Sequence, residues 1–318
     1  MQRPIVYLLM LVAAAGSWLF FDDFKLPLPS QSPSPSIAGP SLPAPPASPR
    51  GEGVIRIASF NIQAFGQSKT SQPELMELIA DIISRFDIVA IQETRSKQQN
   101  VLPRLIDYLN RHGRQYDFVI GPRLGRSENY KEQFAYVFDQ SRIEVDRNQL
   151  YTIEDPRDDL HREPLVAWFR TRLPDPQKAF TFSLVNVHND PDEQQYENTL
   201  MDEVFRAVRN DGRGEDDVIM LGDFNASVDP MQRMMQMPEL TWVLIDEKTN
   251  VKNTAQYDNV CFSSMYTDEF TGRRGVIDFM RDYNLSLKDA LRVSDHFPVW
   301  AEFSVYEGGA HGRPARRD

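Results

Sequence analysis

Five apolar segments of this sequence end in polar residues of the types that serve acid–base and metal chemistry. They are residues 59–61 (Ser-Phe-Asn), 91–93 (Ile-Gln-Glu), 186–188 (Asn-Val-His), 221–225 (Leu-Gly-Asp-Phe-Asn) and 294–298 (Ser-Asp-His-Phe-Pro). Carboxylate and amide oxygens bind hard divalent cations, and histidine exchanges protons near neutral pH. A capped turn or a rim histidine explains any one segment alone about as well. Five together favour a single functional site at one rim of a sheet.

The elements that must position these residues have the patterns of short strands and amphipathic helices. Strand-like apolar runs occupy residues 54–62, 87–92, 118–120, 135–138, 165–169, 180–187, 218–221, 259–262 and 296–303. Apolar residues recur at helical spacing over residues 75–86, 102–109 and 200–208. Many strands, few helices and short connections predict sheets covered by helices in a single α/β or α+β domain.

Composition and charge exclude several classes of protein. The chain has 318 residues with 35 Lys+Arg against 46 Asp+Glu, a formal net charge of −11. This acidic balance repels phosphate backbones at long range, so any nucleic-acid activity must come from a local site or from bound metal. Cys261 is the single cysteine, which excludes an intrachain disulfide and cysteine-ligated metal clusters.

The N-terminal region has the pattern of a targeting segment followed by a spacer. We interpret residues 1–25 as a signal anchor or signal peptide, because Arg3 precedes an apolar run over residues 4–21. The small residues at 13–16 offer a cleavage site, but the run continues past them, which slightly favours the anchor. We therefore expect the protein to be exported. It would be membrane-anchored with its domain outside the cytoplasm, or secreted or periplasmic if the segment is cleaved.

The rest of the chain divides into three parts. Residues 26–52 are rich in proline and serine and predict a disordered linker, which we favour over a polyproline ligand for a partner. The globular domain covers residues 53–305, and residues 306–318 predict a flexible tail.

The motifs resemble those of the endonuclease/exonuclease/phosphatase superfamily, most closely its deoxyribonuclease I branch. The superfamily resemblance rests on residues 59–62, 92–93, 222–226 and 294–298, and the branch resemblance on residues 92–95, 107–110, 124–127, 130–132, 162–164 and 257–258. It covers roughly residues 54–304. It implies a four-layer sandwich of two packed mixed β-sheets flanked by helices, and a phosphodiesterase that depends on a divalent metal.

The resemblance also assigns a metal site and two histidine pairs. Asn61, Glu93 and Asp295 are expected to hold Mg²⁺ or Mn²⁺. His296 is expected to pair with Asp258, and His188 with Glu132, so that each carboxylate fixes its imidazole. Asp223 and Asn225 are expected to contact the phosphate or a second metal. Which histidine is the acid and which the base stays open.

Three further residues carry the expectation that DNA is the substrate. By resemblance, Arg95 enters the minor groove, Tyr130 packs against a sugar and Arg162 clamps a phosphate. We therefore expect a deoxyribonuclease I-like endonuclease with little sequence preference. No obligate protein partner is inferred, and the membrane is a partner only if the N-terminal segment stays uncleaved.

Two alternatives keep the same fold. One is a phospholipid or inositol-phosphate phosphodiesterase or phosphatase, and the other is an inactive DNA-binding module. Calcium is a further candidate cofactor, because Asp190, Asp192 and Glu193 either bind Ca²⁺ or form a solvated loop. We favour the solvated loop, and we expect the methionines of residues 231–237 to lie in a packed helix.

Overall fold

The computed structural model describes residues 51, 53–111, 113–127, 130–235, 237 and 239–309. The predicted targeting segment, nearly all of the linker and the tail beyond residue 309 lie outside the described residues. Within the part that is described, no helix is long and apolar enough to cross a membrane.

The first of two β-sheets is seven-stranded and mixed. Its strand order is β12-β13-β1-β2-β5-β3, and β4 pairs with β5. Strand β1 runs parallel to β2 and antiparallel to β13. The strands are β1 (Val54–Gly66), β2 (Ile88–Arg95), β3 (Tyr116–Ile120), β4 (Leu124–Ser127), β5 (Tyr130–Asp139), β12 (Phe270–Val276) and β13 (Val299–Ser304).

The second sheet is six-stranded, with the order β10-β11-β9-β8-β7-β6. Its central strands β8 and β9 are parallel, and the neighbouring pairs are antiparallel. The strands are β6 (Ile143–Thr152), β7 (Leu165–Thr171), β8 (Thr181–His188), β9 (Val218–Asp223), β10 (Leu240–Trp242) and β11 (Asp258–Ser263).

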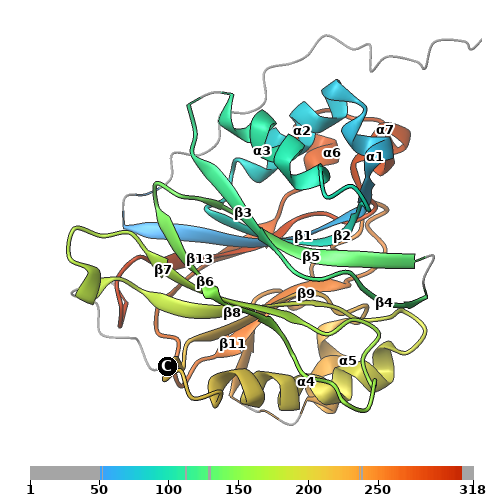
Figure 1. Ribbon diagram of the computed structural model, residues 1–318. Coiled ribbons are helices and arrows are strands. Elements are labelled where there is room, and N and C mark those ends of the chain that lie inside the picture. Colours follow the sequence, from blue (N-terminus) through green and yellow to red (C-terminus); the bar gives the residue numbers. More distant parts are fainter. Residues whose placement is uncertain are drawn as a thin grey trace, which may run out of the picture. The chain divides into compact units, whose positions relative to one another are not determined.

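Helices cover the outer face of each sheet, so the domain has four layers (Figure 1). The first sheet is covered by α1 (Gln67–Thr70), α2 (Pro73–Ile83), α3 (Val101–Asn110), α6 (Phe279–Asp282) and α7 (Leu287–Val293). The second is covered by α4 (Gln194–Arg209) and α5 (Val228–Met234), and a short 3₁₀ turn spans Pro176–Lys178. The predicted four-layer sandwich of two mixed sheets is therefore confirmed.

The helices bury the apolar stripe that the sequence pattern indicated. Helix α2 begins with Pro73, which is tolerated at a first helical position, and buries Leu75, Ile79 and Ile82 against the sheet. In the methionine-rich run, Met231 lies in α5, and Met235 and Met237 are buried just beyond its end. This run is therefore packed against the second sheet, but only its first part is helical, because α5 ends at Met234.

The core between the sheets follows the two-residue alternation of each strand. In β1, Ile55 and Ile57 face this core, whereas Ala58 and Phe60 face the helices. The same alternation in the other central strands decides which polar residues at the strand ends face the space between the sheets.

Candidate active site

The polar residues at the strand ends meet at one edge of the space between the two sheets. On β1 the series Ile57, Ser59, Asn61 runs from the core toward this edge, because alternate residues point the same way. Extending the alternation on the other strands places Glu132 of β5, His188 of β8, Asp223 of β9 and Asp258 of β11 on the inner face. His188 and Asp258 are both register partners of Asp223.

The strand pairing of the first sheet is irregular at this edge. The pairing of β1 with β2 shifts register between Asn61 and Phe65, and that of β2 with β5 shifts between Ile91 and Thr94. Glu93 has a φ of 62°, a conformation that costs a non-glycine residue free energy. Ala64 holds it there, because its N–H donates to Glu93 Oε2 over 2.7 Å.

Gly222 brings β9 close enough to β8 to place Asp223. A Cβ atom at position 222 would lie 2.0 Å from the carbonyl oxygen of Val187, so only glycine fits. Asp223 follows directly, and Asn225 turns the chain away with a φ of 50°, which asparagine tolerates. The N–H of Asn225 donates to Asp223 Oδ1 over 2.9 Å.

His188 is held by a buried carboxylate. Its Nδ1 lies 2.6 Å from Oε1 of Glu132, whose exposed fraction is 1%. Arg162 supports the pair, because its Nε donates to the carbonyl oxygen of His188 over 2.9 Å and lies 3.4 Å from Glu132 Oε1. The structure therefore joins Arg162 to the pair of His188 and Glu132, and its contact with a phosphate stays a prediction.

His296 is held in the same way by a second carboxylate. Its Nδ1 lies 2.8 Å from Asp258 Oδ2, which also accepts a 2.7 Å hydrogen bond from the Thr249 hydroxyl. The N–H of His296 donates to Ser294 Oγ over 3.1 Å, and that hydroxyl donates to the carbonyl oxygen of Asn61 over 2.6 Å. Both histidines thus have their predicted partner.

Asp223 lies between the two imidazoles. Its Oδ2 is 3.8 Å from His188 Nε2 and 3.6 Å from His296 Nε2, and it accepts a 3.0 Å hydrogen bond from Asn61 Nδ2. Since each Nδ1 is used by a carboxylate, each histidine presents Nε2 to the same small space. Two proton-exchanging nitrogens and one carboxylate oxygen therefore converge on a common point.

The carboxylates raise the pKa of both histidines. Burial alone would lower the pKa of His188, but the charges of Glu132 and Asp223 outweigh burial and raise it. Burial likewise acts to lower the pKa of His296, and the charges of Asp258 and Asp223 raise it to about 10. Conversely, the pKa of Glu132 is lowered by His188 and Arg162 despite its burial. The pair of His188 and Glu132 therefore favours imidazolium facing carboxylate, whereas burial raises the pKa of Asp258 in the second pair.

The residues predicted to hold a metal offer unpaired oxygens. Asn61 Oδ1 and Asp295 Oδ1 are buried and accept no hydrogen bond, and Asn61 Nδ2 lies 3.4 Å from Glu93 Oε1. Asp295 Oδ2 accepts from Gln63 Nε2 over 2.9 Å, which orients its side chain. Hard oxygens of this kind suit Mg²⁺ or Mn²⁺.

A second group of possible ligands lies beside the first. One ligand atom from each of Asp223, Asp258 and His296 falls within 4.8 Å of the other two. Because His296 and Asp258 are already hydrogen-bonded to each other, this group fits acid–base chemistry as well as metal binding. The predicted assignment of Asp223 to the phosphate or to a second metal stays open.

Arg95 and Tyr130 form a pair beside Glu93. The Arg95 guanidinium lies over the Tyr130 ring, 4.1 Å from its centroid, and it also contacts the Tyr130 hydroxyl. Arg95 Nη2 is 2.5 Å from Glu93 Oε2. Tyr130 is 46% exposed, so the pair borders the solvent beside Glu93, one of the residues predicted to hold a metal.

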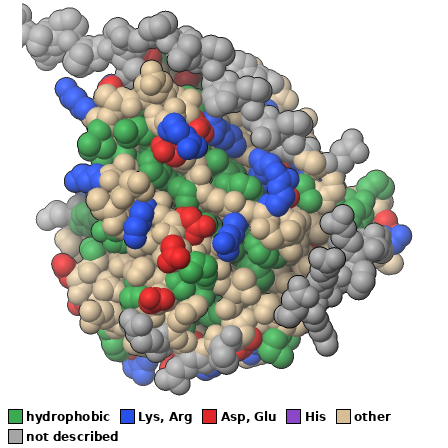
Figure 2. All heavy atoms as spheres, turned by 180° about the vertical axis from the view of Figure 1, so that it is seen from behind, with side chains coloured by type: hydrophobic (Ala, Val, Ile, Leu, Met, Phe, Trp, Pro, Cys, Tyr) green, Lys and Arg blue, Asp and Glu red, His purple; other side chains and the backbone are tan. Residues whose placement is uncertain are grey.

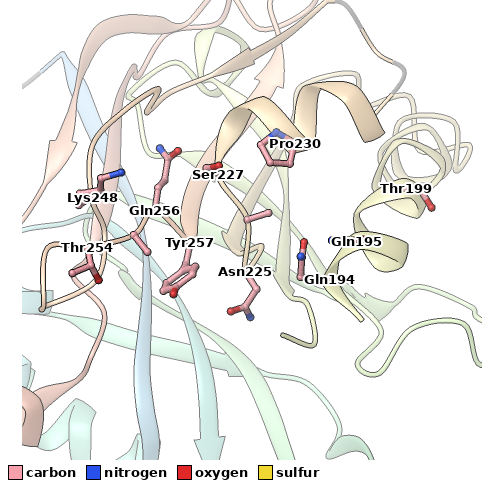
Figure 3. A pocket seen from close by; sticks show the side chains of 12 residues that line it. Gln194, Gln195, Thr199, Asn225, Ser227, Pro230, Lys248, Thr254, Gln256 and Tyr257 are labelled. Carbon is pink, nitrogen blue, oxygen red and sulfur yellow. The ribbon is translucent and has the colours of Figure 1, made fainter. Parts of the chain in front are cut away.

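An open pocket with a cavity volume of about 750 Å³ adjoins the histidines. Asn225 and Tyr257 lie on its wall, and the ring of Tyr257 is 5.8 Å from that of His296. Figure 3 shows Lys248 and Gln194 on opposite sides of these two residues. A substrate larger than a single phosphate can therefore extend from the histidines into this pocket.

The chain is similar to known proteins in sequence and in fold. Residues 58–280 match the Endonuclease/Exonuclease/phosphatase family. The chain belongs to this family. It is 34% identical over 273 residues to deoxyribonuclease gamma of Mus musculus, covering 80% of this chain and 86% of that protein. It is 30% identical over 262 residues to deoxyribonuclease-1 of Bos taurus, covering 77% and 90%. These relatives confirm the predicted resemblance to the deoxyribonuclease I branch.

Solved structures of other proteins share the fold. The human Nocturnin catalytic domain with bound sulfate anion superimposes with a TM-score of 0.53 at 16% identity, covering 80% of this chain and 94% of that chain. Truncated TDP2 of Caenorhabditis elegans gives 0.54 at 14% identity, covering 79% and 98%.

Three residues near the site were not predicted from the sequence. Gln63 orients Asp295, and Thr249 donates to Asp258. Lys69 is 9% exposed, and its Nζ donates to the carbonyl oxygen of Val293, over 2.6 Å, just before Asp295. Thr249 and Lys69 do not follow an apolar strand run, so the signal that found the other site residues did not apply to them. Gln63 directly follows the run over residues 54–62, so that signal could have found it.

Proposed function

We propose that this protein is a divalent-metal-dependent endonuclease that hydrolyses DNA with little sequence preference. The observation that carries the proposal is the convergence of His188 Nε2 and His296 Nε2 on Asp223 Oδ2, at 3.8 and 3.6 Å. Hydrolysis of a phosphodiester needs one group to take a proton from water and another to protonate the leaving oxygen. Two imidazoles on either side of a common point meet this need.

The carboxylates prepare both histidines for proton exchange. Glu132 and Asp258 fix each ring with Nε2 facing the substrate and stabilise the charged form of the ring. One histidine acts as base through Nε2 while the other donates its Nε2 proton, and the geometry is symmetric enough to permit either assignment. Asn61 orients Asp223 between them through its 3.0 Å hydrogen bond.

Asn61, Glu93 and Asp295 would hold the cation. Bound there, Mg²⁺ or Mn²⁺ would neutralise charge on the phosphoryl oxygens. Lys69 and Arg95 supply positive charge next to these carboxylates, which limits repulsion among the acids.

DNA is supported as substrate by local groups rather than by overall charge. Figure 2 shows arginine and lysine side chains interleaved with acidic ones on the face seen from behind, not gathered into one basic patch. Arg95 and Tyr130 together offer a cation and an aromatic ring at the solvent border, which suits a phosphate and a sugar or base. Both similar proteins named above are called deoxyribonucleases. The predicted targeting segment would place this activity outside the cytoplasm.

The test is a substrate panel with the full-length chain. Supercoiled plasmid DNA, RNA, sphingomyelin and inositol phosphates are each incubated with Mg²⁺, with Mn²⁺ and with EDTA. We expect nicked and then linear plasmid with either metal and none with EDTA. Hydrolysis of a lipid or inositol phosphate without plasmid cleavage would contradict the proposal, and so would metal-supported DNA binding without cleavage.

A further inference from the structure

Three carboxylates from separate segments converge at the end of the sheets away from the histidines. Asp217 precedes the first residue of β9, Glu269 precedes β12 and Glu307 follows β13. One carboxylate oxygen from each lies within 4.8 Å of those from the other two. The length of β9, roughly 20 Å at about 3.3 Å per residue, separates Asp217 from Asp223 at the other end. This acidic cluster (Asp217, Glu269 and Glu307) is therefore distinct from the candidate active site.

Two of the three carboxylates are buried. Asp217 and Glu269 are each 2% exposed. Glu269 Oε2 accepts no hydrogen bond, whereas Asp217 is hydrogen-bonded to the Thr267 side chain. Among the described residues, no arginine or lysine forms an ion pair with any member of the cluster. Leaving charged oxygens buried and unpaired costs free energy unless a proton or a cation neutralises them.

Burial and mutual repulsion leave these groups poorly suited to being free anions. Burial, with the charge of Glu269 added, raises the pKa of Asp217 to about 9. Burial, with Glu307 and Asp268 nearby, raises the pKa of Glu269 to about 7. Near neutral pH Asp217 therefore holds a proton unless a bound cation replaces it.

Backbone groups hold two of the carboxylates in position. The N–H of Gly308 donates to Glu269 Oε1 over 2.6 Å, and the N–H of Thr181 donates to Glu307 Oε2 over 3.1 Å. Glu269 keeps Oε2 for a ligand, and the Glu307 side chain is hydrogen-bonded to Asp217. Glu307 is exposed, so it forms the side of the cluster that faces the solvent, from which an ion can enter.

We propose that Asp217, Glu269 and Glu307 form a second divalent-cation site, with Ca²⁺ as its preferred ion. Ca²⁺ accepts carboxylate ligands in a flexible geometry, whereas Mg²⁺ demands a near-ideal octahedron and usually keeps several waters. Three carboxylates, some of them bidentate, also approach the six to eight oxygens that Ca²⁺ takes.

A cation there would stabilise the fold rather than take part in chemistry. It would link the connection before β9, the connection before β12 and the segment after β13, which lie far apart in the sequence. Because a ligand that binds only the folded state raises its stability, unfolding should depend on Ca²⁺ concentration. This inference does not depend on the proposed nuclease activity.

The test is thermal unfolding of the full-length chain in EDTA and with increasing Ca²⁺ or Mg²⁺. For the wild type we expect Ca²⁺ to raise the midpoint by about 5–10 °C at 100 times its dissociation constant, and Mg²⁺ to raise it less. In the double variant Asp217→Asn, Glu269→Gln most of the Ca²⁺ shift disappears. Its midpoint in EDTA at pH 8 is no lower than that of the wild type, because the amides remove the repulsion.

Two control variants separate this site from other sources of Ca²⁺ dependence. Glu203→Gln removes an exposed carboxylate on α4 and should keep the full shift. Glu93→Gln alters the candidate active site and should remove only the part of the shift that a cation bound there contributes. If Ca²⁺ raises the unfolding midpoint equally in the double variant and in the wild type, the proposal is wrong. The carboxylates of the cluster would then be neutralised by a shared proton instead of a cation.

Terbium luminescence gives a second measurement that does not depend on unfolding. Trp168 Nε1 donates to Glu215 Oε2 over 2.8 Å, and Glu215 is itself within 4.8 Å of Asp217. Tb³⁺ at the site should therefore emit when tryptophan is excited, with emission reduced severalfold by Trp168→Phe. It should also fall on addition of Ca²⁺. Emission unchanged by Trp168→Phe would contradict binding at this position.

Discussion

Gln92 Nε2 donates a 2.6 Å hydrogen bond to Asn186 Oδ1 and so links the two sheets directly behind the candidate active site. Asn186 Nδ2 in turn donates to the carbonyl oxygens of Ile91 and Ala135, at 3.2 Å each. Gln92 and Asn186 are fully buried. Gln92 precedes Glu93 on β2, and Asn186 lies two residues before His188 on β8. This bond therefore sets the position of β2 relative to β8.

Replacing Gln92 with leucine should therefore destabilise the fold and slow the reaction together. Gln92→Leu leaves Asn186 Oδ1 buried and unpaired, which costs about 1–3 kcal/mol in the free energy of unfolding. Urea unfolding measures this cost, and a double-mutant cycle with Asn186→Leu measures the coupling of the two side chains. A coupling energy of zero would show that the bond does not join the sheets energetically.

The carboxylates behind the histidines should matter for rate more than for stability. Glu132→Gln and Asp258→Asn keep the side-chain size but cannot stabilise an imidazolium or enforce its tautomer. We expect each variant to lower the plasmid-nicking rate by about 10²–10⁴. Circular dichroism should show the fold retained.

A buried carboxylate at the opposite end of β2 serves as the matched control. Asp87 Oδ2 accepts a 2.8 Å hydrogen bond from the N–H of Arg56. Asp87→Asn should change stability but not the nicking rate of the folded fraction. Rates for Glu132→Gln or Asp258→Asn equal to that of Asp87→Asn would remove the carboxylate from the mechanism.

The sequence predicted the central strands and the site because both follow from one alternation. On β1, Ile57, Ser59 and Asn61 share a face, so the pattern that fills the core also points Asn61 into the site. The same holds for His188 on β8. Apolar strands that end in polar residues were therefore visible without a structure.

The strands that escaped prediction lack that apolar pattern. Strand β12 includes Thr271, Gly272, Arg273 and Arg274, which are all exposed, at the edge of its sheet. Strand β6 is an edge strand as well, and it is mostly half-buried or exposed. Such strands are formed by pairing with a neighbour rather than by burial of their own side chains, which a local pattern does not reveal.

Arg95 should contribute to DNA binding through phosphate charge. Arg95→Ala removes one cation from the solvent border, so affinity should fall for all sequences, and the slope of log K against log salt should become shallower by about 1. Because Arg95 also contacts Glu93, binding is measured in EDTA, where cleavage does not interfere. Tyr130→Phe keeps the ring under the guanidinium and should retain most of the affinity.

Arg111 at the end of α3 provides the control for this measurement. It pairs with Glu77 through a 2.9 Å contact and is not joined to the site by any described contact. Arg111→Ala should leave the salt slope unchanged. An effect of Arg95→Ala that varied with base sequence would instead indicate a base contact.

Lys69 should make stability depend on pH in the alkaline range. Burial lowers its pKa from 10.5 to about 8, although the charges of Glu93 and Asp295 act to raise it. Between about pH 8 and 10.5 the unfolded chain therefore binds a proton at Lys69 that the folded protein does not. Stability then rises with pH across this window, and below pH 8 the contribution is constant because both states are protonated.

Urea unfolding in EDTA between pH 7 and 10 tests this expectation against Lys69→Met. The wild type should gain up to about 3 kcal/mol relative to the variant over the window, since one pKa unit corresponds to about 1.4 kcal/mol. Lys97→Met, which removes an exposed lysine, should show no such difference. Parallel pH profiles for the wild type and Lys69→Met would mean that Lys69 stays charged in the folded protein, held by the carboxylates of Glu93 and Asp295.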